Sequence, residues 1–304
     1  MTLRVLDPGL YTLVVDFGRP GWRSLGVPVG GAADRASLAL GNALVGNPPD
    51  AAALEISLAG PTLEASCELA CVVYGAAFTL DSDRQRLTAG KTFTLRPGER
   101  LRVGATEQGM RAYFCVRGGL QTPAVLGSRS GLEPLAAGEK LPCRPGRIHA
   151  RYVPDSGIDN PADGPLRVLA GPQADWFPAE DFCGPGSFFR VTPASDRMGV
   201  RLLGEPLRLP DGELVSEPVC PGSVQVTRDG QCIVLGVDGQ TIGGYPKVAQ
   251  VISADLDRVG RLRPGDGVRF QRVQLGEAKW LYHARQRLLR EWVTRLRTAE
   301  LFTP

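Results

Sequence analysis

The chain has 304 residues, of which 43% are hydrophobic and 22% charged, and its 35 basic and 32 acidic residues leave a formal net charge of +3. These values are typical of a globular protein long enough for about two domains. The small net charge, together with the lack of a basic stripe interleaved with aromatic residues, excludes the electrostatic pattern of a nucleic-acid-binding protein.

The sequence also predicts a compartment and a redox state. Residues 1–9 place a charge and a proline where a signal peptide needs its apolar segment, and no apolar run is long enough to cross a membrane. We therefore expect a cytoplasmic protein outside the membrane. The seven cysteines are scattered, mostly in apolar runs, as expected for reduced thiols. Cys67 and Cys71 lack a nearby histidine or second cysteine pair, so we predict no metal site.

A glycine-rich segment lies near the start of the chain. Between Asp16 and Asp34, glycine and proline occur too densely for regular structure, which predicts a long loop. Such loops in compact domains are usually functional, although an arm that packs against another subunit remains an alternative. Asp34 is suited to cap a helix over residues 36–44 that ends at residues 46–48.

Short strands dominate the rest of the first half. Apolar, β-branched runs separated by turn formers cover residues 53–58, 69–74, 92–95, 100–103 and 110–116. This rhythm is typical of a sandwich or barrel and not of alternating strands and helices. Residues 154–165 are rich in proline, glycine and aspartate and predict a linker.

The second half repeats the β pattern. It opens with an expected strand at 166–170 and a short helix within 171–177, followed by strands as far as residue 270. The Pro-Gly-acid turn in Leu262–Phe270 resembles that in Leu95–Val103, which favours duplicated β-barrels, although such turns also recur by coincidence. A helix is expected from Glu277 to Phe302, with an apolar stripe of Leu281, Leu288, Trp292, Leu296 and Ala299. The basic side chains on its other faces favour contact of these faces with solvent over contact with a membrane or a partner.

These patterns predict a mainly β protein with few helices and a C-terminal helix. The expected parts are an N-terminal β domain with its glycine-rich loop at 1–153, a C-terminal β-barrel at 166–275, and the helix at 276–304.

Polar side chains are concentrated in the loop Asp238–Lys247, which lies between two apolar runs, 231–237 and 248–253, that read as strands. Gly243 and Gly244 permit a close approach of backbone to a ligand, and Pro246 restricts where Lys247 points. The loop also carries Asp238, Gln240, Thr241 and Tyr245. A cation, an acid and amide groups suit a small anionic or carbonyl substrate, while a solvated hairpin tip is the simpler alternative.

Familiar catalytic motifs are missing. Gly90-Lys91-Thr92 lacks the earlier glycine of a phosphate-binding loop, and Gly127–Gly131 has Arg129 at its centre, where a nucleophile elbow has serine. The two histidines, His149 and His283, have no acidic or serine motif beside them. What remains is a set of carboxylate and arginine neighbours in glycine-rich loops: Asp16 with Arg19, Asp34 with Arg35, and Asp196 with Arg197.

A set of short motifs extends from about residue 4 to 270. They are Gly9-Leu-Tyr-Thr12, Asp16-x-Gly-Arg-Pro-Gly21, Gly26-Val-Pro28, Gly31-Ala-x-Asp34, Leu44-Val-Gly-Asn47, Ala53-Leu-Glu55, Gly127-Ser-Arg-Ser130, Gly171-Pro-Gln-Ala-Asp175, Ser195-Asp-Arg-Met-Gly199 and Gly243-Gly-Tyr-Pro-Lys247. Together they resemble the biotin-dependent carboxyltransferase family. Its members include the C subunit of bacterial 5-oxoprolinase, also called allophanate hydrolase subunit 2 or KipA, and part of urea carboxylase.

The resemblance implies two cyclophilin-like β domains and a heteromeric enzyme. The partners would be a KipI-like B subunit and a LamB/YcsF-like A subunit, and the complex would use ATP with Mg to cleave 5-oxoproline to glutamate. A homo-oligomer of this heterocomplex is compatible with the resemblance. In this setting we expect Lys247 to meet developing charge, Arg197 to hold the substrate carboxylate, and Asp196 or Asp238 to manage a proton. The other expected substrate contacts are Arg19, Asp34, Gln240, Thr241, Gly243, Gly244 and Tyr245.

Two further functions remain open. In the carboxyltransferase half of a urea carboxylase, the same groups would orient carboxybiotin and urea. Because the chain has no Ala-Met-Lys-Met sequence, the biotin would be carried by a separate domain. Alternatively, the chain is a non-catalytic protein that binds a KipI-like histidine kinase inhibitor. The sequence departs from the family pattern at Gly239, where the family usually has arginine, and this leaves open a related small amide or urea-like substrate.

Overall fold

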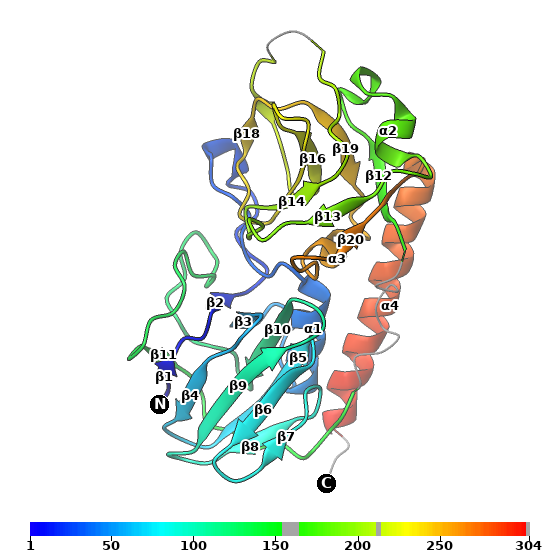
Figure 1. Ribbon diagram of the computed structural model, residues 1–304. Coiled ribbons are helices and arrows are strands. Elements are labelled where there is room, and N and C mark those ends of the chain that lie inside the picture. Colours follow the sequence, from blue (N-terminus) through cyan, green and yellow to red (C-terminus); the bar gives the residue numbers. More distant parts are fainter. Residues whose placement is uncertain (154–163, 211–213, 302–304) are drawn as a thin grey trace. The chain divides into compact units, whose positions relative to one another are not determined.

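A computed structural model describes residues 1–153, 164–210 and 214–301 (Figure 1). The chain forms two compact units: residues 1–19, 34–158 and 288–304 belong to the first, and residues 20–33 and 159–287 belong to the second. The expected parts at 1–153, 166–275 and 276–304 differ from these units, because residues 20–33 group with the second half and the last helix is divided between both. The expected linker at 154–165 lies almost wholly outside the described residues.

The first unit holds two antiparallel sheets. One has the order β11 (Lys140–Pro142), β1 (Thr2–Asp7), β4 (Thr62–Ala65), β9 (Arg100–Thr106), β6 (Phe78–Ser82) and β7 (Arg86–Leu87). The other has the order β2 (Tyr11–Val15), β3 (Ala53–Ser57), β10 (Arg111–Val116), β5 (Leu69–Gly75) and β8 (Phe93–Leu95). Side chains from both sheets, such as Val5 and Leu101 from one and Leu54 and Phe114 from the other, share one core. The sheets therefore pack face to face, and buried positions alternate in β1, β4 and β9 of the first sheet, whereas β3, β5 and β10 of the second are buried on both faces.

A short helix, α1 (Arg35–Leu44), packs against β5 and β10. Asp34 caps it as predicted, because its carboxylate accepts hydrogen bonds from the amide and the hydroxyl of Ser37 at 3.0 and 2.6 Å. A Cβ at Gly41 would lie 2.9 Å from the sulfur of Cys115, so glycine lets this helix approach the sheet closely.

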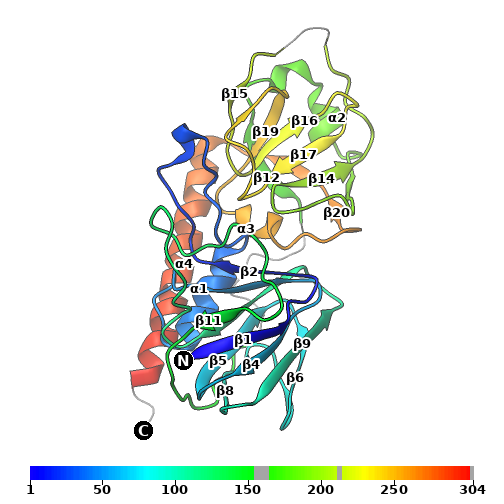
Figure 2. The same ribbon diagram turned by 90° about the vertical axis from the view of Figure 1, so that its left-hand side faces the viewer.

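The second unit is a single curved sheet. Its order is β20 (Gly267–Val268), β13 (Phe189–Val191), β14 (Gly199–Leu203), β17 (Cys232–Leu235), β16 (Ser223–Val226), β19 (Lys247–Val251), β12 (Leu166–Ala170) and β21 (Phe270–Arg272). The two edge strands, β20 and β21, are separated only by Arg269, so the sheet curls into a nearly closed barrel (Figure 2). In the core of this unit Phe182 stacks on Phe270, and Phe189 meets both rings at steeper angles.

Smaller elements complete this unit. A two-stranded ribbon pairs β15 (Glu217–Pro218) with β18 (Ile242–Gly243). The helical turns are η1 (Arg23–Leu25), η2 (Ala174–Trp176), α2 (Ala179–Cys183) and α3 (Leu256–Val259). The mainly β architecture with few helices is thus confirmed.

The last helix, α4, runs from Leu275 to Leu301, and the expected end at Phe302 lies outside the described residues. Its more buried stripe includes Leu281, Trp292 and Leu296, as predicted. Leu288, by contrast, is 39% exposed, because the covered stripe runs through Leu289 instead. Among the described residues, no helix is long and apolar enough to cross a membrane.

Candidate functional site

Lys247 starts strand β19 beside a β-bulge. The register pairs Val224 of β16 with Ala249 but Gln225 with Lys247, so Val248 is the extra residue. Val224 and Ala249 belong to the barrel core, and cross-strand partners point to the same face. Lys247 and Gln225 therefore share the other face, where they are 4% and 1% exposed.

Glu217 of the β15–β18 ribbon supplies the counter-charge. Its Oε2 lies 2.6 Å from the Nζ of Lys247, and the side-chain amide of Gln173 donates to the same oxygen at 3.3 Å. The bond from Lys247, followed by that from Gln173, lowers the pKa of Glu217. The Oε1 of Gln173 accepts the backbone N–H of Lys247 at 2.9 Å, which fixes the start of the strand.

Two buried nitrogen atoms at this place have donor capacity that the described residues do not use. The Nζ of Lys247 has the ion pair with Glu217 and no further hydrogen-bond partner among the described residues, and the Nε2 of Gln225 has none there. A Cβ at Gly243 would lie 2.6 Å from the Nε2 of both Gln225 and Gln240, so the glycine leaves room for two amides to converge. We call Gln173, Glu217, Gln225, Gly243 and Lys247 the Lys247 cluster.

The chemistry of the Lys247 cluster is that of an oxygen-binding site with one acceptor beside it. Leaving buried donors without partners costs free energy, and native structures satisfy nearly all such groups. An ammonium with donors to spare beyond Glu217, and an amide nitrogen without an acceptor among the described residues, therefore fit the carbonyl or anionic oxygen of a ligand, while the carboxylate of Glu217 is suited to accept an N–H.

Arg197 and Asp238 lie in the same unit but are paired with each other. The guanidinium of Arg197 donates to both carboxylate oxygens of Asp238 at 2.6 and 3.1 Å, and its Nη2 also donates to the carbonyl of Gly31 at 2.6 Å. These bonds hold the glycine-rich segment to the barrel. The role of Arg197 in binding a substrate carboxylate stays a prediction, and the geometry gives the residue a positioning role.

The remaining loop residues have varied surroundings. Asp196 accepts the amides of Met198 and Gly199 at 2.8 and 3.1 Å and so closes its own turn. Thr241 is 9% exposed, whereas Tyr245 is 37% exposed. Gln240 and Gly244 are also exposed. The structure thus brings Gly243, Lys247 and the amide of Gln240 together, and leaves the catalytic role of Asp196 a prediction.

Arg19 and Asp34 belong to the first unit. The buried guanidinium of Arg19 donates to the carbonyl of Ser130 at 2.6 Å, and Asp34 caps α1. Their substrate contacts stay predictions as well. Conversely, sequence reasoning missed Gln173, Glu217 and Gln225. Gln173 lies within one of the short family motifs, but the other two carry no local signal.

The surroundings of Asp16, in the first unit, predict how the stability of the protein depends on pH. Burial raises the pKa of this carboxyl, but hydrogen bonds from the hydroxyls of Ser128 and Ser130 and the amides of Arg129 and Gly18 lower it below its usual value. The stability that these bonds contribute is therefore present above the pKa of an unfolded aspartate, about 3.9, and is lost as pH falls through the folded value. We expect Asp16→Asn to lower the urea midpoint at pH 7 and to differ less from the parent near pH 3. If the urea midpoints of the variant and the parent differed as much near pH 3 as at pH 7, this assignment would be contradicted.

Comparison with known proteins places the chain in a family. Residues 25–272 match the model described as carboxyltransferase domain, subdomain A and B. The chain is 35% identical to the 5-oxoprolinase C subunit of Escherichia coli over 97% of this chain and 98% of the relative, and 33% identical to the protein of that name from Haemophilus influenzae over 90% and 92%.

A solved structure agrees with the sequence relatives. The urea amidolyase of K. lactis superposes with a TM-score of 0.86 at 27% identity, and the match covers 96% of this chain but 20% of that one. The chain thus spans about a fifth of that larger protein. Because the family model matches most of the chain and the two bacterial relatives match it nearly end to end, the chain belongs to the biotin-dependent carboxyltransferase family.

Proposed function

We propose that the chain is the C subunit of an ATP-dependent 5-oxoprolinase, which converts 5-oxo-L-proline to L-glutamate together with a KipI-like B subunit and a LamB/YcsF-like A subunit. The observation that carries the proposal is the pair of buried donors, Lys247 and Gln225, beside the carboxylate of Glu217. The end-to-end similarity to two proteins named as the C subunit of 5-oxoprolinase supports it.

The Lys247 cluster complements a lactam. A lactam presents a carbonyl oxygen and an N–H, whose nitrogen is bonded to the carbonyl carbon. The ammonium of Lys247 and the amide of Gln225 would donate to the oxygen, and Glu217 would accept the N–H. Donors fixed before the reaction stabilise the negative charge that develops on a carbonyl oxygen, which is the largest single contribution in many enzymes of acyl transfer. The low pKa of Glu217 keeps it ionised as an acceptor.

In the proposed complex, ATP with Mg would supply the chemistry that activates the lactam oxygen, a phosphoryl transfer to that oxygen. The donor set fits such a ligand, because an ammonium and an amide bind a phosphoryl oxygen as readily as a carbonyl oxygen. No group of three His, Cys, Asp or Glu side chains among the described residues is arranged to hold a metal ion, and we assign none of them to magnesium.

A second candidate is the carboxyltransferase half of a urea carboxylase. The superposition on the urea amidolyase of K. lactis favours it, and urea offers the same carbonyl and N–H groups to the Lys247 cluster. Biotin would then be delivered on a separate carrier domain. The two functions differ in the co-substrate and in the partner.

Reconstitution distinguishes the two. The chain, purified with the B-type and A-type subunits, is expected to release glutamate from 5-oxoproline only when ATP and all three chains are present. The same preparation should not carboxylate urea when it is given bicarbonate and a biotinylated carrier with its biotin carboxylase. Urea carboxylation without glutamate release would reverse the assignment.

A further inference from the structure

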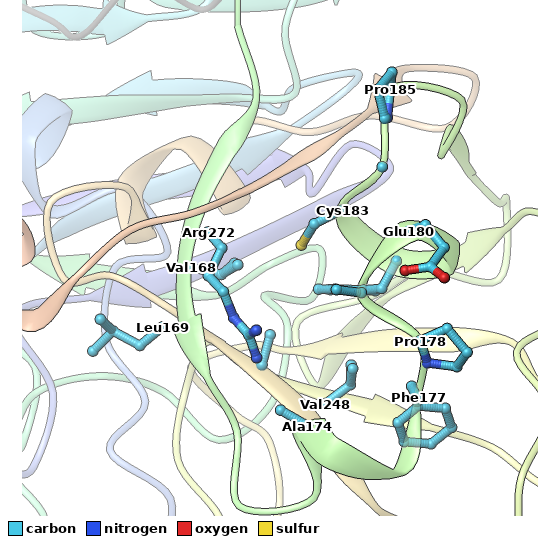
Figure 3. A pocket seen from close by; sticks show the side chains of 14 residues that line it. Val168, Leu169, Ala174, Phe177, Pro178, Glu180, Cys183, Pro185, Val248 and Arg272 are labelled. Atoms are coloured by element: carbon cyan, nitrogen blue, oxygen red, sulfur yellow. The ribbon is translucent and has the colours of Figure 1, made fainter.

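A pocket separate from the Lys247 cluster lies in the second unit, between α2 and the strands β12, β19 and β21 (Figure 3). It encloses about 310 Å³, at the lower end of the range for small-molecule sites. Its wall is mostly apolar and includes the side chains of Val168, Phe177, Phe182 and Val248, which are all at most 4% exposed. Preformed apolar walls of this kind suit the hydrocarbon part of a ligand.

Two charged groups border the apolar wall. Arg272 extends from β21 into the pocket, and Glu180 lies across from it on α2 (Figure 3). Arg272 is exposed, and its guanidinium forms no hydrogen bond or ion pair with any described residue. Burial raises the pKa of Cys183, which also lines the pocket, and the charge of the neighbouring Arg272 opposes that effect.

Arg272, whose guanidinium has no partner among the described residues, lies at the edge of an apolar cavity and favours one chemical class of ligand. Guanidinium groups bind carboxylates through two parallel N–H bonds, and the surrounding apolar side chains exclude water from the rest of the ligand. Glu180 disfavours a second negative charge in the ligand. We propose that this pocket binds a small monocarboxylic acid with an apolar body, its carboxylate paired with Arg272 and its hydrocarbon part against Phe177, Phe182 and Val248.

This pocket does not share its polar groups with the Lys247 cluster. Val248 and Ala249 line it, whereas the ammonium of the preceding residue, Lys247, pairs with Glu217 of the ribbon. The proposal therefore does not depend on the proposed 5-oxoprolinase activity. Substitution of Lys247 should leave binding in the pocket unchanged.

Benzoate is a suitable probe, because it combines one carboxylate with a rigid apolar ring. For so few atoms we expect a Kd on the order of 1 mM, measured by calorimetry or NMR titration on the full chain. Benzyl alcohol, which matches the ring but lacks the charge, should bind at least tenfold more weakly. Arg272→Met should weaken benzoate binding tenfold or more, whereas Arg208→Met, at an exposed arginine outside the pocket, should have no effect.

A second readout places the ligand. Cys183 lines the pocket, so saturating benzoate should slow its alkylation by N-ethylmaleimide, and should not slow alkylation of the exposed Cys220. Equal binding of benzoate and benzyl alcohol, unchanged affinity in Arg272→Met, or unprotected Cys183 at saturation would each overturn the proposal. Unchanged binding in Lys247→Met would support it, and a loss there would overturn the separation of the two sites.

Discussion

Lys247→Met should lower glutamate release by the reconstituted complex by about 10²- to 10³-fold, the usual cost of removing one donor to a developing oxyanion. Methionine keeps most of the side-chain volume but removes the ammonium, which is 2.6 Å from Glu217. The effect should fall on kcat, because the donor is needed most when charge develops on the oxygen. Steady-state assays at several concentrations of 5-oxoproline measure it.

Two further variants distinguish a catalytic loss from a structural one. Lys279→Met removes a charge from an exposed position of α4 and should leave turnover unchanged. Gln225→Leu removes a buried amide whose Nε2 has no partner among the described residues, so the variant should be as stable as the parent or slightly more so. We nevertheless expect its turnover to fall. Full activity in Lys247→Met, with the three subunits still bound together, would remove the Lys247 cluster from the reaction.

The positions of strands could be read from the sequence where apolar runs are bounded by turn formers. The runs expected at 53–58 and 69–74 are β3 and β5, and the two that flank the loop Asp238–Lys247 contain β17 and most of β19. The cap at Asp34 was equally local, since it depends only on residues three positions apart. Such features are determined within a few residues, so a single sequence suffices to predict them.

The arrangement of the Lys247 cluster depended on information that no local pattern carries. Lys247 is brought to Gln225 by a bulge in β19, and without that extra residue the alternation from Ala249 would have turned Lys247 toward the core. Glu217 reaches the cluster through a ribbon whose strands, β15 and β18, have two residues each. Strands that short leave no hydrophobic period to detect.

The grouping of residues 20–33 with the second unit likewise depends on distant contacts. Residues 20–33 precede every strand of the barrel by more than a hundred positions, yet they belong to its unit. The contacts that tie them there are specific hydrogen bonds: the carbonyl of Gly31 accepts from Arg197, and the amide of Gly30 donates to the carbonyl of Val237. Glycine-rich composition predicted a loop, but composition does not encode which distant side chain holds it.

A buried ion pair in the first unit should give the largest change in stability. Glu55 of β3 and Arg111 of β10 are 1% and 6% exposed, and the Nε of Arg111 lies 3.2 Å from the Oε1 of Glu55. The hydroxyl of Tyr113 donates to the other oxygen of Glu55 at 2.8 Å and accepts the amide of Asp34. The pair therefore connects two strands to the first turn of α1, and each oxygen of Glu55 has a donor.

Arg111→Met should lower the free energy of unfolding by about 3–5 kcal/mol, because it leaves the carboxylate of Glu55 buried without its counter-charge. The double variant Glu55→Leu/Arg111→Met should recover much of that loss, since an apolar pair of similar volume avoids the desolvation of two charges. Its recovery should be incomplete, because Tyr113 loses its acceptor. Burial already raises the pKa of Tyr113 well above its usual value, so the hydroxyl stays neutral and still needs a hydrogen-bond partner. Urea denaturation of the parent, of the single variants Arg111→Met and Glu55→Leu, and of the double variant completes a double-mutant cycle. If the double variant were less stable than Arg111→Met alone, the ion pair would be ruled out as the source of the loss.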